Sequence, residues 1–280
     1  MARLAESGAL QYAVENNNLV VDVSRLGASG YISGAYKDFM QWSSYNVGVE
    51  PACLSARGHL YHSFYKELSS YGYNCIAGGD FFSTPDSAAA SITGNITIVV
   101  DVALDDWTPT STNALVAKDT LSAGTRSYLL NVTTTGALRF YFSINGTAAI
   151  AVTSDVLSFV DGTRQHVAVE RESVTGKVRF YTSIDGQTWV MHGVEQTSTT
   201  GAIFDSPTIV QFGNVAASSL LLAGKVFDSE IYAGLKISES ANAVMKVDFD
   251  PTDWVSGTTW TSADTGEVWT INGNALVNRT

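Results

Sequence analysis

Positive charge is scarce in this sequence. Of its 280 residues, 16 are Lys or Arg against 27 Asp or Glu, which gives a formal net charge of -11. Nucleic-acid backbones bind proteins that present a concentrated positive field, so nucleic acid is excluded as the main partner. An acidic surplus of this kind suits a soluble surface protein, or one with a few Ca²⁺ sites.

Long apolar runs and cysteines are also scarce. No apolar run reaches the roughly 18 residues that a membrane span requires, so we expect no membrane span. The start of the sequence, Met1-Ala-Arg-Leu-Ala-Glu6, has no apolar signal core, so we expect no secretory leader. Cys53 and Cys75 are the only cysteines and lack metal-ligand spacing. We expect them to be reduced, although a disulfide between them is geometrically possible.

The pattern of the sequence changes near Gly79, which predicts an N-terminal segment, 1–78, and a main domain, 79–280. In the first segment, Leu19–Val23 favours a strand, and Pro51–Tyr71 favours a helix because apolar residues recur there at helical spacing. The remaining aromatic-rich stretch has no clear period. It either docks on a partner as an anchoring arm or packs on the main domain's own edge.

After Gly79 the apolar residues alternate with a period of two, which is typical of half-buried strands. Gly and Asn recur between the alternating runs, as in Asn145-Gly146, where tight turns are favoured. The expected strands are 96–104, 128–132, 138–144, 165–172, 177–184, 208–213, 225–232, 245–249 and 267–271. The sequence therefore predicts an all-β fold, an antiparallel jelly-roll β-sandwich, preceded by a small irregular segment with a short helix.

Particular segments of the main domain resemble laminin-G and concanavalin-A-like domains. Asp80–Asp101 is similar to their opening strands, with a Pro-Asp-Ser-Ala turn followed by a Gly-Asn-Ile-Thr-Ile strand. Ala114–Lys118 resembles the next strand. Gly162–Arg171 resembles the strand in which the family often has Trp-His-His-Val-Ala, with Arg-Gln standing here before His166. The resemblance implies the sandwich fold and leaves the ligand open, because this fold hosts many functions.

The end of the sequence carries a narrower resemblance. Phe249–Trp254 and Thr259–Leu276 are similar to the ends of laminin-G-like domains in minor tail and other virion proteins of tailed bacteriophages. This resemblance implies a non-enzymatic virion protein, in a tail, a fibre or a capsid decoration, that is made in the host cytoplasm. Its expected partners are other virion proteins through residues 1–78, copies of itself, and a host surface glycan. The alternative is a carbohydrate-binding module, whether or not it is part of a particle.

Catalytic patterns are weak. Glu170 and Glu172 share a strand face, but the Glu-x-Asp-x-Glu triplet of β-glucanases is absent, so a solvated strand face is favoured over a glycoside hydrolase. Ser183–Trp189 resembles a sialidase Asp-box that is one residue short. We expect Asp185 to bind local backbone N–H groups in a structural turn. His59 and His62 do not have zinc-site spacing.

Ligand binding is the more plausible chemistry. Calcium prefers carboxylate and carbonyl oxygens, and the candidate ligands are Asp101, Asp105, Asp106, Asp248 and Asp250. Sugars stack on aromatic rings, and the candidate glycan-binding residues are Trp107, Asp105 and Trp189. Against both hypotheses, Asp residues at strand ends commonly form turns, and these tryptophans could instead lie in the core or at an interface.

Overall fold

A computed structural model of the chain describes residues 11–15, 18–22, 71–75, 80–215, 220–273 and 276–279. For the strands at 11–15, 18–22, 71–75 and 276–279 it describes the backbone alone. The chain divides into two compact units, Met1–Ser69 and Ser70–Thr280, and each is considered by itself.

The first unit contains one described hairpin. Strand β1 (Gln11–Glu15) pairs in antiparallel fashion with β2 (Asn18–Asp22), close to the strand expected at 19–23. The predicted helix at 51–71 lies outside the described residues except for Tyr71, which begins strand β3. Strand β3 precedes Gly79 and nevertheless pairs with strands of the second unit.

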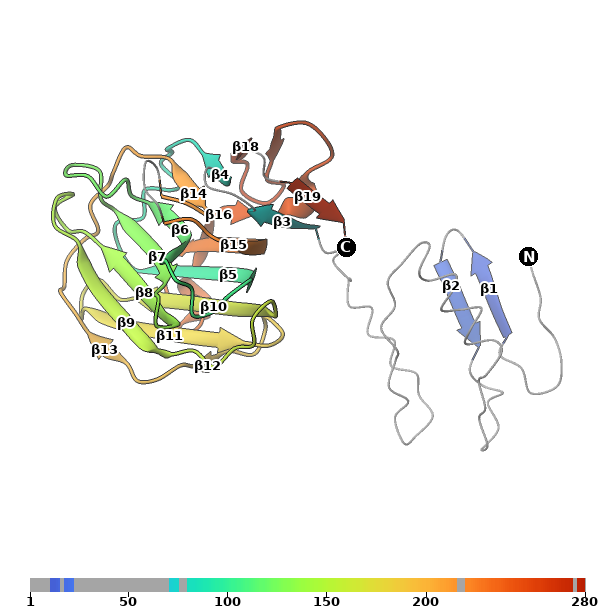
Figure 1. Ribbon diagram of the computed structural model, residues 1–280, viewed down its shortest axis with the longest axis horizontal. Helices are drawn as coiled ribbons and strands as arrows, with labels where there is room; N and C mark the ends of the chain where they lie inside the picture. Colours follow the sequence, from blue (N-terminus) through green and yellow to red (C-terminus); the bar gives the residue numbers. More distant parts are fainter. Residues whose placement is uncertain are drawn as a thin grey trace. The chain divides into compact units, whose positions relative to one another are not determined.

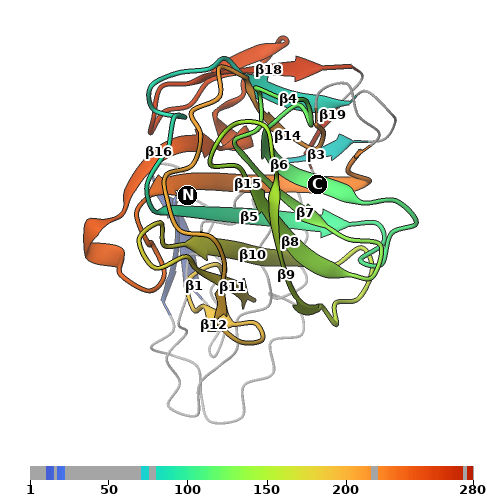
Figure 2. The same cartoon turned by 90° about the vertical axis from the view of Figure 1, so that its left-hand side faces the viewer.

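The second unit is an antiparallel β-sandwich, seen as two layers of strands in Figures 1 and 2. One sheet has nine strands in the order β12-β11-β10-β5-β15-β3-β19, with β13 added to β11 and β16 added to β15. Its strands are β3 (Tyr71–Cys75), β5 (Ile96–Leu104), β10 (Arg164–Arg171), β11 (Lys177–Ser183), β12 (Val190–Met191), β13 (Gln196–Thr197), β15 (Gly224–Ala233), β16 (Val244–Phe249) and β19 (Leu276–Arg279).

The other sheet has eight strands in the order β17-β18-β4-β14-β6-β7-β8-β9. Its strands are β4 (Phe81–Thr84), β6 (Asn113–Lys118), β7 (Tyr128–Val132), β8 (Ala137–Phe142), β9 (Ile150–Val156), β14 (Val210–Phe212), β17 (Thr259–Thr261) and β18 (Val268–Asn272). Two short 3-10 helices, η1 (Ser240–Asn242) and η2 (Pro251–Asp253), flank β16. No helix among the described residues is long and apolar enough to cross a membrane.

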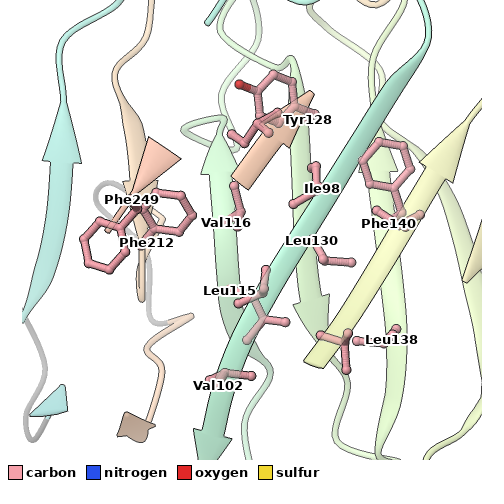
Figure 3. Packing of buried hydrophobic residues seen from close by; sticks show 14 of the residues in the cluster. Ile98, Val102, Leu115, Val116, Tyr128, Leu130, Leu138, Phe140, Phe212 and Phe249 are labelled. Carbon is pink, nitrogen blue, oxygen red and sulfur yellow. The ribbon is translucent and has the colours of Figure 1, made fainter. Parts of the chain in front are cut away.

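The core lies between the two sheets, where alternate side chains of facing strands meet. Figure 3 shows Ile98 and Val102 of β5 beside Val116, Leu130 and Phe140 of β6, β7 and β8. These side chains are fully buried. The period-two pattern therefore arises because every second residue enters this core, as β-branched and aromatic residues favour.

The expected antiparallel sandwich is confirmed, with most strand ends within two residues of their predicted bounds. Strand β9 was not predicted, because it lies at the sheet edge and buries little more than Val152. The turn at Asn145 is longer than a two-residue hairpin. Its side chain accepts hydrogen bonds from the N–H groups of Thr147 and Ala148, while Gly146 takes the positive φ.

Candidate functional site

The outer face of the nine-stranded sheet carries a row of polar side chains. In β5, Val100 and Val102 enter the core, so Asp101 between them points outward. Strand register sets Asp101 opposite His166 of β10 and Asp228 of β15, and sets His166 opposite Ser183 of β11. We call Ser183, His166, Asp101 and Asp228 the His166 row.

Arg164 lies two residues before His166 in β10 and therefore shares its outer face. Two side chains, Asp101 and Phe227, contact its guanidinium group. Its Nε lies 2.8 Å and 2.9 Å from the two carboxylate oxygens of Asp101, and its Nη2 also donates to Asp101. Its guanidinium carbon lies 4.2 Å from the ring centroid of Phe227. About a third of the side chain stays exposed, 34% against 5% for Asp101. Asp101 and Phe227 thus orient the guanidinium while part of it faces solvent, an arrangement typical of Arg in recognition sites.

His166 is half-buried beside the same carboxylate. Its Nδ1 lies 3.7 Å from Oδ2 of Asp101. Burial lowers the pKa of His166, and Arg164 lowers it further, while Asp101 and Asp185 act in the opposite direction. The imidazole is therefore neutral at neutral pH, with one ring nitrogen as a donor and the other as an acceptor.

The turn between β11 and β12 stands beside His166. Asp185 accepts hydrogen bonds from the backbone N–H groups of Gln187 and Thr188, so the expected structural role of Asp185 is confirmed. These bonds hold its pKa well below the usual range. Glycine is required at 186: φ there is 68°, and a Cβ would come within 3.1 Å of the His166 ring.

Trp189 follows this turn at the edge of the sheet and is half-buried. The next residues pair with β11, Val190 with Thr182 and Met191 with Tyr181. Strand alternation puts residue 189 on the same face as Met191, which is the outer face and the end of the His166 row nearest β12. The sequence candidates Trp189 and Asp101 therefore belong to one face.

Asp228 ends the row on the side of β15. A β-bulge in β15 leaves Phe227 without a partner on β5 and turns Asp228 toward Asp101. Its Oδ1 is buried and has no hydrogen-bond partner among the described residues. Burial raises the pKa of Asp228 well above its usual range, helped by the charges of Glu230 and Asp248. A carboxyl that keeps its proton to a higher pH than usual can both donate and accept over that range.

Glu170 is a weak catalytic candidate by sequence, and its surroundings in the fold give it a structural role. Its carboxylate is fully buried and accepts hydrogen bonds from Tyr181 Oη, Thr97 Oγ1, both donors of Ser238 and the N–H of Ile237. These bonds fix the loop after β15 to the sheet. Glu172 lies 4.0 Å from Arg179 instead, so the two carboxylates have different surroundings.

Trp107 does not belong to a binding surface, which corrects the prediction that it stacks on a sugar. Its side chain is 1% exposed and packs edge-on against Phe159 at 4.8 Å between centroids. Its backbone N–H donates to Asp161. The ring is enclosed because it belongs to the core between the sheets, so it offers no face to a ligand.

The candidate calcium ligands do not come together. Asp101 is paired with Arg164, and Asp106 accepts from the N–H and hydroxyl of Thr108. Asp105 is exposed beside it. No group of three or more His, Cys, Asp or Glu residues within the described part of the chain could hold a metal ion.

The second pair of candidate calcium ligands has local partners. Asp250 caps η2 by accepting from the N–H of Thr252. Asp248 is buried, accepts from the hydroxyl of Ser262, and has its pKa raised by burial to about 7. Calcium binding by these aspartates therefore stays a prediction.

Sequence reasoning missed Arg164, Phe227 and Asp228. The available signal is that Arg164 stands in the sequence where the resembled strand often has Trp-His. Its partner Asp101 is 63 positions away. Arg164 and Asp101 come together only through the order of the strands in the sheet, which the local sequence does not specify.

Comparison with known proteins supports the fold. No protein-family model and no curated protein sequence matches the chain. A candidate carbohydrate-binding protein of Bacteroides ovatus superposes with a TM-score of 0.51 at 11% identity, covering 75% of this chain and 60% of its own.

Two further solved structures are similar. The CBM40 module of the Ruminococcus gnavus IT-sialidase, bound to α2,3-sialyllactose, gives a TM-score of 0.47 at 9% identity, covering 61% of this chain and 93% of its own. Domains LG4-5 of the mouse laminin α1 chain give 0.44 at 13% identity, covering 64% and 44%. The two antiparallel sheets of the chain form a jelly-roll sandwich, as its superposition on the Bacteroides ovatus protein also indicates.

Proposed function

We propose that this protein binds glycans through the outer face of the nine-stranded sheet, along the His166 row from Trp189 to Asp228. The observation that carries the proposal is the orientation of Arg164, which is held by Asp101 and Phe227 and left partly exposed beside a neutral His166. Preset polar groups beside an aromatic ring are the usual composition of a small-ligand site.

Each group has a role that its chemistry suits. Sugar hydroxyls donate and accept, so they can pair with the imidazole of His166 and with the guanidinium of Arg164. The half-buried ring of Trp189 offers an apolar face to the C–H side of a sugar. The similar fold of the Bacteroides ovatus protein supports this proposal at the level of fold.

We propose binding without catalysis. Glu170 is a fully buried carboxylate on this face, and its hydrogen-bond partners are donors that fix a loop and a neighbouring strand. No observation on the described residues bears on the virion role, its partner proteins or its location, and these stay predictions.

A glycan array tests the proposal, using the full chain with and without Ca²⁺. We expect saturable binding that Trp189→Ala weakens about tenfold, which corresponds to about 1.4 kcal/mol. Trp254→Ala is the matched control, because Trp254 is also half-buried and lies outside the His166 row. Arg164→Gln is expected to weaken binding as much as Trp189→Ala.

Two results would contradict the site. One is equal loss in Trp189→Ala and Trp254→Ala. The other is the absence of saturable binding by the unmodified protein across the array. Loss of binding on chelation of Ca²⁺ would support the calcium prediction separately from the choice of face.

A further inference from the structure

The end of the His166 row on β15 carries an excess of negative charge. Asp228 and Glu230 share the outer face of β15, and strand register sets Glu230 opposite Asp248 of β16. We call these three side chains the acidic end of the row. Glu230 accepts a hydrogen bond from Tyr232 Oη, and Asp248 accepts one from the hydroxyl of Ser262. Both donors are uncharged, so these bonds leave the negative charge in place.

The positive side chains nearby have other surroundings. Arg164 pairs with Asp101. Lys236 lies over the ring of Tyr232, with its Nζ 5.1 Å from the ring centroid. In the described structure no lysine or arginine forms an ion pair with the acidic end, and this includes the lysines closest along the chain, Lys225, Lys236 and Lys246. The acidic end therefore lacks a counter-ion from the described residues.

Asp228 is the member of the acidic end that has no hydrogen bond either. Its Oδ1 is enclosed without a partner among the described residues, while the residue as a whole stays partly exposed. A ligand on the outer face can therefore reach the carboxyl. Burial and the charges of Glu230 and Asp248 raise the pKa of Asp228, as expected where like charges meet without a cation. A positive group at this point would relieve both the missing partner and the repulsion.

We infer that the glycan bound by the His166 row carries a free amine, whose ammonium group lies against Asp228. The inference rests on the proposed function, because Trp189 and Arg164 have to hold the sugar on the same face. An ammonium has three donors, so it can contact Asp228 and still donate to Glu230 or to a ligand oxygen. A carboxylated or sulfated sugar would meet the acidic end with like charge, so acidic glycans are disfavoured.

A metal ion is the other positive ligand to consider at the acidic end. Across the described ranges, no group of three or more His, Cys, Asp or Glu residues could hold a metal ion. An ammonium needs no such group, because one carboxylate and a few acceptors satisfy it. The acidic end therefore fits an amino sugar better than a metal ion.

The test compares the free-amine and N-acetylated forms of the same sugars. An array of glucosamine and galactosamine oligosaccharides is probed with the full chain in EDTA, before and after N-acetylation with acetic anhydride, which turns each amine into an uncharged amide. For at least one glycan, we expect the unmodified protein to bind the free amine about tenfold more tightly than the amide. Raising NaCl from about 50 to 500 mM should reduce this preference, because salt screens the ion pair.

Variants locate the preference. Asp228→Asn keeps the shape of the side chain without its charge, so the free amine should lose its tenfold advantage while the N-acetylated form binds as before. Glu230→Gln should reduce the advantage severalfold, and it preserves the test if Asp228→Asn does not fold. Asp264→Asn is the matched control, because it removes an exposed carboxylate outside the acidic end and should keep the preference.

Trp189→Ala separates failure of this inference from failure of the proposed function. Equal binding of the two forms, both weakened in Trp189→Ala, would overturn the amine and leave the His166 row as the glycan site. A preference for the free amine that persists in both Asp228→Asn and Glu230→Gln would overturn the acidic end as its cause. Absence of saturable binding to any glycan by the unmodified protein would overturn both proposals.

Discussion

The outer faces of the two sheets differ in whether their buried polar side chains have hydrogen-bond partners. On the nine-stranded sheet, Glu170 collects donors from two strands and a loop, and Asp101 takes the guanidinium of Arg164. On the eight-stranded sheet, Asn131 and Gln211 are as deeply buried as Glu170, yet their amides have no partner in the described structure.

This difference shows what each face contributes. A buried network of paired polar groups stabilises one arrangement, because losing one member leaves the others buried without hydrogen-bond partners. Unpaired amides do the reverse: they make the covered state less favourable than an apolar surface of the same shape would be. The polar groups of the first face are hydrogen-bonded to one another, whereas the two amides of the second face have no partner in the described structure.

The largest effect is expected from Glu170→Ala. Tyr181, Ile237 and Ser238 lose their acceptor and the loop after β15 loses its attachment, so we expect a loss of about 4 kcal/mol in the free energy of unfolding. Chemical denaturation measures it. Glu172→Ala, on the same strand face, is the control and should cost about 1 kcal/mol or less. Similar losses in both variants would contradict the paired-network account.

The next effect is a dependence on pH. Folding raises the pKa of Asp248 to about 7, so the folded state keeps a proton that the unfolded chain releases near pH 4. The free energy of unfolding should therefore fall by about 3–4 kcal/mol as pH rises from about 4 to 7. The raised pKa of Asp228 acts in the same direction.

Asp248→Asn isolates this contribution. The amide stays neutral, so the variant should be more stable than the unmodified protein at pH 8 and should have a flatter pH profile. Thermal unfolding measured from pH 4.5 to 8 gives both quantities. Asp105→Asn, at an exposed position, is the control for the loss of one carboxylate. An unchanged profile in Asp248→Asn would refute the assignment.

The smallest effects have opposite signs on the two faces. Thr97 donates to Gly234 and accepts from the N–H of Lys236, so Thr97→Val should cost about 1–2 kcal/mol. Gln211→Leu removes only unpaired atoms and should gain up to about 1 kcal/mol. Denaturant titration of both variants compares the faces directly. A lower free energy of unfolding in Gln211→Leu would contradict the difference between the two outer faces.

Most of the fold could be predicted because each central strand buries every second residue. In β5, the alternation of Ile98, Val100 and Val102 is visible in the sequence and is the same pattern that fills the core. The edge strand β9 could not be predicted, because with one face solvated and one edge open it carries little apolar signal.

The candidate site was only partly predictable. Asp101 and Trp189 could be named from residue type, but Arg164 and Asp228 join them through register between strands far apart in the sequence. Trp107 misled for a physical reason. A tryptophan beside two aspartates suggests a rim, yet here the chain turns so that the ring closes the core and the carboxylates stay outside. The residue type of Trp107 indicates what it could bind, but its exposure depends on how the chain turns around it.

Strands β3 and β19 have a mechanical consequence. They are antiparallel neighbours at one side of the nine-stranded sheet, and Tyr71, where the chain enters the sheet, pairs with Arg279, where it leaves. A force applied to the two ends of this unit would load these backbone hydrogen bonds one pair at a time, from the Tyr71 end inward. Such unzipping resists far less than shearing, in which all the bonds share the load, so β19 would be the first strand to peel away under tension.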